Sequence, residues 1–184
     1  MGKSVLIVLA EGFEEIEAVT PIDVLRRAGF EVIVAGVGGT EIKGAHGITV
    51  RADVPLEKYD GTPDAVVLPG GMPGADNLAE SATLGRVLER ANREGRVIGA
   101  ICAAPAVVLG PTGYLDGRKA TCYPGYEKHF SSKTRLVTDR VVKDGHFITS
   151  RGPGSAFEFA LELVEKLAGP KEAGKLSETM LARA

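Results

Sequence analysis

Four short runs rich in Val, Ile and Leu constrain the fold of this chain more than any other feature. They occupy residues 4–10, 31–37, 65–68 and 96–101. Strands that are buried on both faces of a parallel sheet have this composition, because neither face meets water. Helical patterns at residues 15–28 and 84–92 lie between the runs, as the crossovers of parallel strands require. The order predicts an α/β sandwich with a mostly parallel central sheet and helices on both faces.

The remaining segments predict two antiparallel pieces and a third helix. Residues 41–50 and 135–150 are read as hairpins, the second on the strength of its Asp144-Gly145 turn signal. Ser155 is the expected cap of the third helix, with Glu158 reaching back to complete a capping box. Residues 171–183 are either a short docking helix or partly disordered.

Size and charge exclude several classes of protein. With 184 residues, 44% of them hydrophobic and 25% charged, the chain is expected to form one domain over residues 1–184. Lys and Arg total 22 against 24 Asp and Glu, so no basic field favours nucleic acid or an anionic membrane. The single short apolar run at the start predicts neither a signal peptide nor a membrane span. Two cysteines without a CxxC pair suit a reducing, cytoplasmic location.

The fourth apolar run ends at Cys102 in a pattern typical of a nucleophile elbow. A sharp strand-to-helix turn needs small neighbours, because the turn is strained and the helix packs close to the strand. The positive end of the helix dipole would favour a thiolate at such a turn. The alternative is a small apolar cysteine buried at a strand end. The small residues around Cys102 are Gly99, Ala100, Ala103 and Ala104.

Two other segments follow apolar runs and should meet Cys102 at the same sheet edge. Residues 11–17 follow the first run and residues 69–74 follow the third. In open α/β sheets, ligands bind beyond the carboxyl ends of the strands. Gly70 and Gly71 offer backbone N–H groups that can donate to an oxyanion, although an ordinary glycine turn is the alternative.

The acidic stretch after the first run supplies the candidate acid. Glu17 lies one helical turn beyond Glu14, so one of the two can point inward. We expect Glu17 to be half-buried beside the sulfur and protonated, so that it can donate a hydrogen bond or exchange a proton with substrate. For Glu14 and Glu15 the favoured interpretation is a solvated, acidic helix start.

The other candidate side chains are expected to be structural. His46, His129 and His146 show no pair with metal-ligand spacing, so we predict no metal. His46 and His146 are expected to be exposed in hairpins. Cys122 is expected to pack as a small hydrophobe, since no motif links it to Cys102.

Five motifs in order resemble the ThiJ/PfpI superfamily, most closely its branch around the Parkinson-disease-associated protein. The resemblance runs from about residue 3 to residue 167. It implies a flavodoxin-like three-layer sandwich of the class I glutamine amidotransferase-like type, no cofactor, and usually a homodimer. The motifs lie at residues 9–17, 23–29, 67–71, 100–105 and 150–154.

The resemblance also implies roles for individual residues. Cys102 matches the elbow nucleophile and oxidation-sensitive thiolate, and Glu17 matches the protonated glutamate beside it. Gly70 and Gly71 match the oxyanion donors, and Ala103 adds an N–H. His46 falls where the family has a polar residue near the partner subunit's site, and residues 151–154 resemble a dimer-contact loop. With Glu14, His46 completes the predicted substrate-binding set.

Two departures from the family pattern narrow the function. Peptidase-like members place a His directly after the nucleophile, where this chain has Ala103. Members credited with glyoxalase or deglycase chemistry carry a His before a Pro about twenty residues later, where this chain has Tyr123. Tyr123 can orient a carbonyl or donate a proton, but a phenol is poorly matched to act as a base near neutral pH.

Three functions follow as hypotheses. The first is a cofactor-independent glyoxalase or deglycase that acts on methylglyoxal-like dicarbonyls or their protein adducts, with Cys102 as nucleophile and Glu17 and Tyr123 as further catalytic residues. The second is an oxidative-stress sensor or chaperone-like protein that is switched by oxidation of Cys102. An intracellular cysteine peptidase or amidase is a minor alternative.

Overall fold

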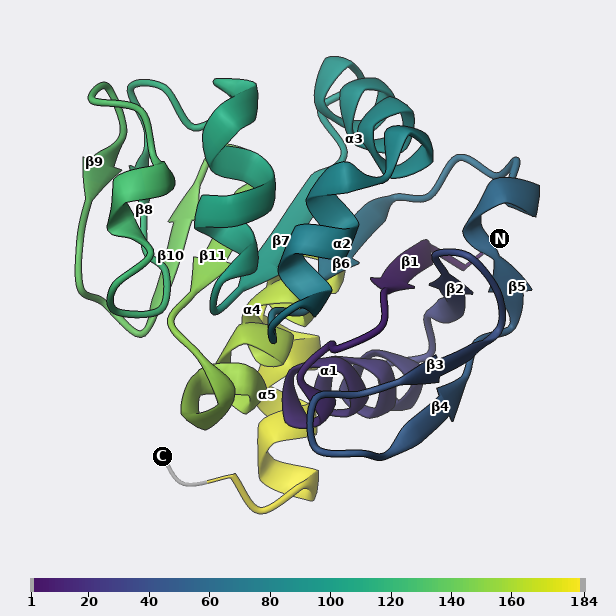
Figure 1. Ribbon diagram of the computed structural model, residues 1–184. Helices are drawn as coiled ribbons and strands as arrows, with labels where there is room; N and C mark the ends of the chain where they lie inside the picture. The colour runs from purple at the N-terminus through teal and green to yellow at the C-terminus, as the bar shows by residue number, and fades with distance from the viewer. Residues whose placement is uncertain (1, 183–184) are drawn as a thin grey trace.

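A seven-stranded, mostly parallel sheet forms the centre of the protein in the computed structural model, which describes residues 2–182 (Figure 1). The strands follow one another in the order β10-β11-β7-β6-β1-β2-β5. Antiparallel β10 lies at one edge, and the other neighbours in the sheet pair in parallel. The strands are β1 (Ser4–Leu9), β2 (Glu31–Gly36), β5 (Val54–Pro55), β6 (Ala65–Leu68), β7 (Val97–Ile101), β10 (Val141–Asp144) and β11 (Phe147–Ser150).

Helices cover both faces of the sheet and complete the predicted flavodoxin-like three-layer sandwich. One face packs against α1 (Glu15–Arg27), α4 (Ala156–Ala168) and α5 (Pro170–Thr179). The other packs against α2 (Gly74–Glu80) and α3 (Ala82–Arg93) (Figure 1). Because successive strand side chains point to opposite faces, the residues of β1 divide between two apolar cores. Val5, Ile7 and Leu9 enter the core under α1 and α4, whereas Leu6 and Val8 enter the core under α3.

The predicted helices are confirmed, and local signals explain their ends. At the start of α1, the Glu14 carboxylate accepts a hydrogen bond from the Glu17 N–H at 2.8 Å. The helix ends before Gly29, whose φ of +80° is one that glycine adopts readily. Ser81 caps α3 by accepting from the Leu84 N–H, so this helix begins two residues earlier than predicted.

The predicted capping box at the third helix is wrong. Ser155 is buried, and its hydroxyl lies 2.7 Å from that of Ser150 and donates to the Gly152 carbonyl at 2.9 Å. Glu158 is exposed and accepts hydrogen bonds from Arg140 instead. The Ser155 side chain therefore links the end of β11 to the start of α4, and it forms no reciprocal capping box with Glu158.

Both predicted hairpins exist, one with different bounds. Strands β3 (Glu41–Lys43) and β4 (Thr49–Arg51) form an antiparallel pair apart from the main sheet (Figure 1). The second hairpin is β10–β11, with Gly145 at its turn, and it begins at residue 141 rather than 135. Residues 135 and 136 instead form β9 (Arg135–Leu136), which pairs in parallel with β8 (Lys119–Ala120).

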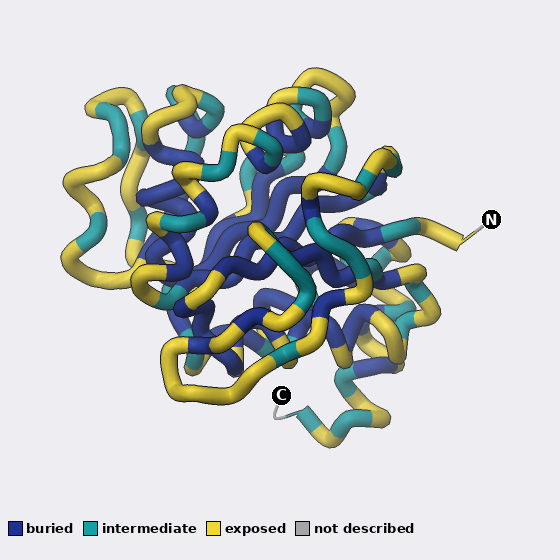
Figure 2. Tube along the Cα trace, turned by 45° about the vertical axis from the view of Figure 1, so that its right-hand side comes forward, coloured by how far each residue is buried: buried dark blue, intermediate teal, exposed yellow. Residues whose placement is uncertain are grey.

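The C-terminal segment docks on the sandwich through an amphipathic helix. Ala173 and Leu176 of α5 are buried in the same core as α4, so the docking-helix interpretation is confirmed for residues 170–179. Residues 183 and 184 of the predicted tail lie outside the described residues. Figure 2 shows the buried strands at the centre beneath partly exposed helices and loops. Between residues 2 and 182, no helix combines the length and apolarity needed to cross a membrane.

Candidate active site

The candidate site lies where the chain leaves β1, β6 and β7 at their carboxyl ends. Because β1 is flanked by β2 and β6, the segments after β1 and β6 leave the sheet at its topological switch point. Close approaches confirm the predicted convergence. A methyl group placed on Gly70 would lie 2.7 Å from the Cys102 Cβ and 2.8 Å from the Glu17 Oε2. All three segments therefore meet at one point.

Cys102 occupies the nucleophile elbow that the sequence predicts. Its φ is +66°, a left-handed conformation that costs a non-glycine residue on the order of 1–3 kcal/mol. Two backbone hydrogen bonds hold it there: the Cys102 N–H donates to the Ser150 carbonyl at 2.9 Å, and the Tyr123 N–H donates to the Cys102 carbonyl at 2.8 Å. Ala103 and Ala104 are buried beside the turn. A short π-helical turn, residues 105–109, follows.

Gly70 and Gly71 lie beside the elbow, and their backbone N–H groups have different partners. The Gly70 N–H donates to the Glu17 Oε2 at 2.9 Å, so it is not available as an oxyanion donor. The predicted oxyanion-donor role of Gly70 is therefore wrong, and its N–H instead positions the Glu17 carboxyl. The N–H groups of Gly71 and Ala103 do face the sulfur, where their hydrogen bonds lower the pKa of the Cys102 thiol. They are the donors that the site offers.

Glu17 is the acid of the site and is fully buried. Its Oε1 has no hydrogen-bond partner among the described residues, and Cys102 lies near enough for its thiol to influence the pKa of the carboxyl. Burial raises the pKa of Glu17 to about 7, against the opposing hydrogen bonds of Cys102 and Gly70. Near neutral pH this carboxyl can therefore both give and take a proton.

Two effects in the fold oppose the thiolate that the sequence predicts at Cys102. The side chain is only 8% exposed, and burial followed by the negative charge of Glu17 raises the pKa of its thiol. The donors at Gly71 and Ala103 oppose these effects but do not outweigh them. The helix start is therefore not the only influence on the charge of this sulfur. The Glu17 carboxylate disfavours a thiolate at Cys102, whereas the neutral thiol favours the carboxylate, so the two groups titrate as a coupled pair.

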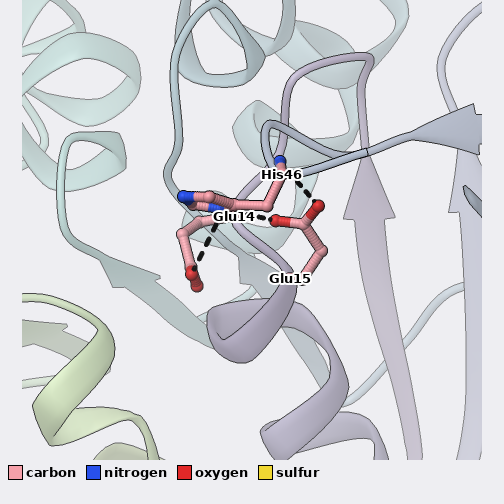
Figure 3. A group of neighbouring side chains, drawn as sticks. All are labelled: Glu14, Glu15 and His46. Carbon is pink, nitrogen blue, oxygen red and sulfur yellow. Dashed lines mark hydrogen bonds and ion pairs between the residues drawn. The ribbon is translucent and has the colours of Figure 1, made fainter. Parts of the chain in front are cut away.

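Glu14, Glu15 and His46 form a second polar group at the start of α1 (Figure 3). Glu15 accepts hydrogen bonds from the His46 backbone N–H at 2.7 Å and from its Nδ1 at 2.9 Å, which raises the pKa of His46. The His46 side chain is 71% exposed, as predicted. Both glutamates are buried, so their predicted solvation is wrong, whereas the predicted acidic helix start is confirmed. Glu14 caps α1 and Glu15 fastens the β3–β4 hairpin to it.

The same three side chains are the described grouping that comes closest to a metal site. Each offers one ligand atom, and these atoms lie within 4.8 Å of one another. The His46 Nδ1 is already hydrogen-bonded to Glu15, and the second oxygen of Glu14 is engaged by the helix start. These atoms thus have protein partners, and the absence of a metal stays a prediction.

A small pocket lies beside Tyr123, the residue whose backbone N–H donates to the Cys102 carbonyl. It encloses about 200 Å³. Tyr123 is 45% exposed, and its ring lies against Gly152, where an added methyl would meet the ring at 3.0 Å. Sequence reasoning missed the contribution of Ser150 and Arg151, although both lie in one of the family motifs. The lining residues are Tyr123, Pro124, Arg140, Arg151, Gly152, Pro153, Gly154 and Ser155.

Two further side chains complete the comparison with the sequence predictions. Cys122 is buried, as predicted, with its Sγ 3.4 Å from the Tyr123 carbonyl oxygen, and burial raises the pKa of its thiol. His146 is half-buried rather than solvated, because its Nε2 lies 2.9 Å from the Asn92 side-chain oxygen. Neither side chain belongs to the site around Cys102.

Comparisons with known proteins agree with this architecture. Residues 3–166 match the model of the DJ-1/PfpI family. Protein DJ-1 homolog B from Arabidopsis thaliana is 42% identical over 183 residues, which are 98% of this chain. The chain spans 42% of the length of that relative. Glutathione-independent glyoxalase DJR-1.2 from Caenorhabditis elegans is 40% identical over 176 residues, covering 95% of this chain and 94% of the relative.

A solved structure shows the same fold over the full length. DJ-1 from Toxoplasma gondii, in its oxidized form, superposes with a TM-score of 0.96 at 40% sequence identity, and the match covers 100% of both chains. The sheet order, the elbow and the family match therefore lead to one conclusion. The chain belongs to the DJ-1/PfpI family.

Proposed function

We propose that this protein is a cysteine-dependent, cofactor-independent glyoxalase or deglycase that acts on methylglyoxal-like 2-oxoaldehydes or their adducts. One observation carries the proposal: a fully buried carboxyl, with a pKa near neutrality, lies beside a nucleophile-elbow thiol, both against Gly70. A carboxyl with such a pKa suits general acid–base catalysis at physiological pH. The name of the nematode relative supports a glyoxalase reaction.

In the proposed reaction the sulfur attacks the aldehyde carbon and the thiol proton passes to the Glu17 carboxylate. The N–H groups of Gly71 and Ala103 stabilise the oxyanion of the resulting hemithioacetal. Glu17 returns the thiol proton to this oxyanion, which completes the hemithioacetal and regenerates the carboxylate. The carboxylate then removes the proton from the former aldehyde carbon and returns it to the neighbouring carbonyl carbon, which leaves a 2-hydroxyacyl thioester on Cys102. Water cleaves the thioester to the 2-hydroxy acid and regenerates the thiol. Tyr123 is proposed to orient the second carbonyl.

Turnover of methylglyoxal to lactate tests the proposal. We expect Cys102→Ser and Glu17→Gln each to lower kcat/KM by at least about a hundredfold, because each removes a group that changes its bonding in the transition state. Cys122→Ser is the matched control, since Cys122 is buried outside the site and should leave turnover unchanged. Unaltered turnover in Cys102→Ser or Glu17→Gln would refute the mechanism.

A second candidate function, oxidation sensing, is supported by the same backbone donors. A sulfinate on Cys102 would accept hydrogen bonds from Gly71 and Ala103, and a protonated Glu17 would donate to it. Two equivalents of peroxide convert the thiol to sulfenic and then sulfinic acid, with release of two waters. Intact mass after mild peroxide should show two added oxygens, confined to Cys102. Equal oxidation of Cys122 would count against a sensing role.

We also propose a homodimer, from an apolar surface at one end of the site. Ile16 and Val19 of α1 and Ile48 of the β3–β4 hairpin are all about half-exposed, and Glu15 ties the two elements together by accepting from the Ile48 N–H. Clustered exposed apolar side chains mark interaction surfaces. Sedimentation velocity should give a dimer that Val19→Glu dissociates. A monomeric wild-type protein would contradict the proposal.

A further inference from the structure

Arg151 is a half-buried cation without a protein partner. Its guanidinium makes no hydrogen bond or ion pair with any residue between 2 and 182. A guanidinium carries five N–H donors, and partial burial without an acceptor is unfavourable for a charged group. The side chain lines the pocket beside Tyr123 and also the neighbouring pocket that contains Cys122. The fold thus presents an unsatisfied positive charge to a hollow surface.

Arg140 lines the same pocket but is neutralised. Its Nε lies 2.8 Å and 3.0 Å from the two carboxylate oxygens of Glu158, and its Nη2 donates to the Gly154 carbonyl. Among residues 2–182, no Asp or Glu lines this pocket. Glu127 lines the adjoining pocket, but its carboxylate accepts from the Gly125 N–H and lies beyond ion-pair distance of Arg151. The net positive charge of the pocket beside Tyr123 therefore comes from Arg151.

The position of Arg151 ties this charge to the elbow. Its preceding residue, Ser150, accepts the backbone hydrogen bond of Cys102, and its following residue, Gly152, lies against the ring of Tyr123. A pocket of about 200 Å³ has room for a small organic acid, since a water molecule takes about 30 Å³. A guanidinium matches the planar oxygens of a carboxylate or phosphate with two parallel hydrogen bonds.

We infer that Arg151 is the specificity residue of the site and binds a carboxylate or phosphate group of the ligand. The inference rests on the proposed function for the class of ligand. The molecules recognised are the 2-hydroxy acid product and 2-oxoaldehydes that carry an anionic group.

Direct binding to the full-length protein tests the inference without relying on turnover. Lactate and inorganic phosphate are titrated separately, by calorimetry or chemical shift, so that the two arms distinguish carboxylate from phosphate recognition. We expect Arg151→Gln to raise the Kd of at least one anion by about tenfold or more, as loss of a charge-assisted hydrogen bond predicts. Arg151→Lys should retain part of the affinity, and higher salt should weaken binding.

Arg140→Gln is the matched control, because it removes a positive charge from the same pocket that is already paired with Glu158. It should leave both Kd values unchanged. Equal loss of binding in Arg140→Gln and Arg151→Gln, or no loss in Arg151→Gln, would overturn the inference. So would the failure of both anions to bind the wild-type protein at millimolar concentration. If Arg151→Gln instead dissociates a dimer and leaves binding intact, Arg151 is a subunit contact and the inference is wrong.

The outcome is separable from that of the proposed function. Persistent methylglyoxal turnover in Cys102→Ser refutes the catalytic proposal, whereas the binding titrations judge Arg151 alone. Selective loss of anion binding in Arg151→Gln would still establish the anion site. Turnover lost in Cys102→Ser but anion binding unchanged in Arg151→Gln would leave the mechanism standing and remove the specificity role.

Discussion

Replacing Glu17 by Gln should make the protein more stable at alkaline pH relative to the wild type. Burial raises the pKa of Glu17 from 4.5 to about 7, so the folded state disfavours the carboxylate. The contribution of this group to stability is fully present below pH 4.5 and is lost as pH rises through 7. The amide introduced by Glu17→Gln does not titrate, and its oxygen can still accept the hydrogen bond from Gly70.

The magnitude follows from the size of the pKa shift. A rise from 4.5 to about 7 corresponds to about 3 kcal/mol, at 1.36 kcal/mol for each pKa unit. Because Glu17 is fully buried, solvent screening does not reduce this figure appreciably. We therefore expect the difference in unfolding free energy between Glu17→Gln and the wild type to grow by about 3 kcal/mol between pH 4 and pH 8.

Urea denaturation followed by far-UV circular dichroism measures this difference, since the chain has no Trp to serve as a fluorescent probe. Protein concentration is kept constant, because self-association would couple to stability. His46 and His146 also titrate in this range, but they are present in both proteins and cancel in the comparison.

Glu15→Gln is the control of opposite sign. Burial opposes its ionisation, but hydrogen bonds from His46 and Ile48 prevail and lower the pKa of Glu15. Its contribution is therefore lost as pH falls, and the difference between Glu15→Gln and the wild type should change in the acid range. Parallel stability curves for Glu17→Gln and the wild type from pH 4 to pH 8 would refute the reasoning, because a buried carboxyl with a raised pKa cannot be neutral in its effect.

Three further predictions test individual contacts. Gly70→Ala should abolish turnover while the fold persists, because the added methyl would lie 2.7 Å from the Cys102 Cβ; circular dichroism alongside a lactate assay measures both. Ser155→Ala should cost about 1–3 kcal/mol in urea denaturation, since it leaves buried polar groups unpaired; an unchanged unfolding free energy would contradict the hydrogen bonds assigned to its hydroxyl. Glu15→Gln should bring the pKa of His46 down toward its ordinary value in an NMR titration, and an unchanged value would contradict the ion pair.

The sheet could be predicted because its strands carry their own signature. The predicted run 65–68 matches β6 at both ends, and the predicted run 4–10 extends one residue beyond β1. The agreement is close because apolar runs separated by helices fit only strands buried on both faces of a parallel sheet. The elbow could be predicted for a similar reason. The strain at Cys102 demands small neighbours, and small neighbours are visible in a sequence.

The details that failed depend on contacts between distant residues. Ser155 and Glu158 have the spacing of a capping box, but Ser150 and Arg140 lie close enough in the fold to take over both side chains. The same holds for Glu15, whose burial depends on the backbone of a hairpin thirty residues away. Local spacing states which bonds a side chain can make, and tertiary structure decides which of them it makes.

The charge on Cys102 is the clearest case of a property that belongs to a pair. From the sequence, the helix start favours a thiolate; in the fold, burial and the charge of Glu17 act against it more strongly. Protonation of Glu17 removes the nearest negative charge, and the donors at Gly71 and Ala103 then favour an ionised sulfur. When the proton passes from Cys102 to Glu17, the buried negative charge moves from the carboxylate to the sulfur. Only one buried anion is present before and after the transfer, so its free-energy cost is lower than that of adding a second buried anion. The nucleophile can be formed at the moment of attack, and a permanently ionised thiol is not required.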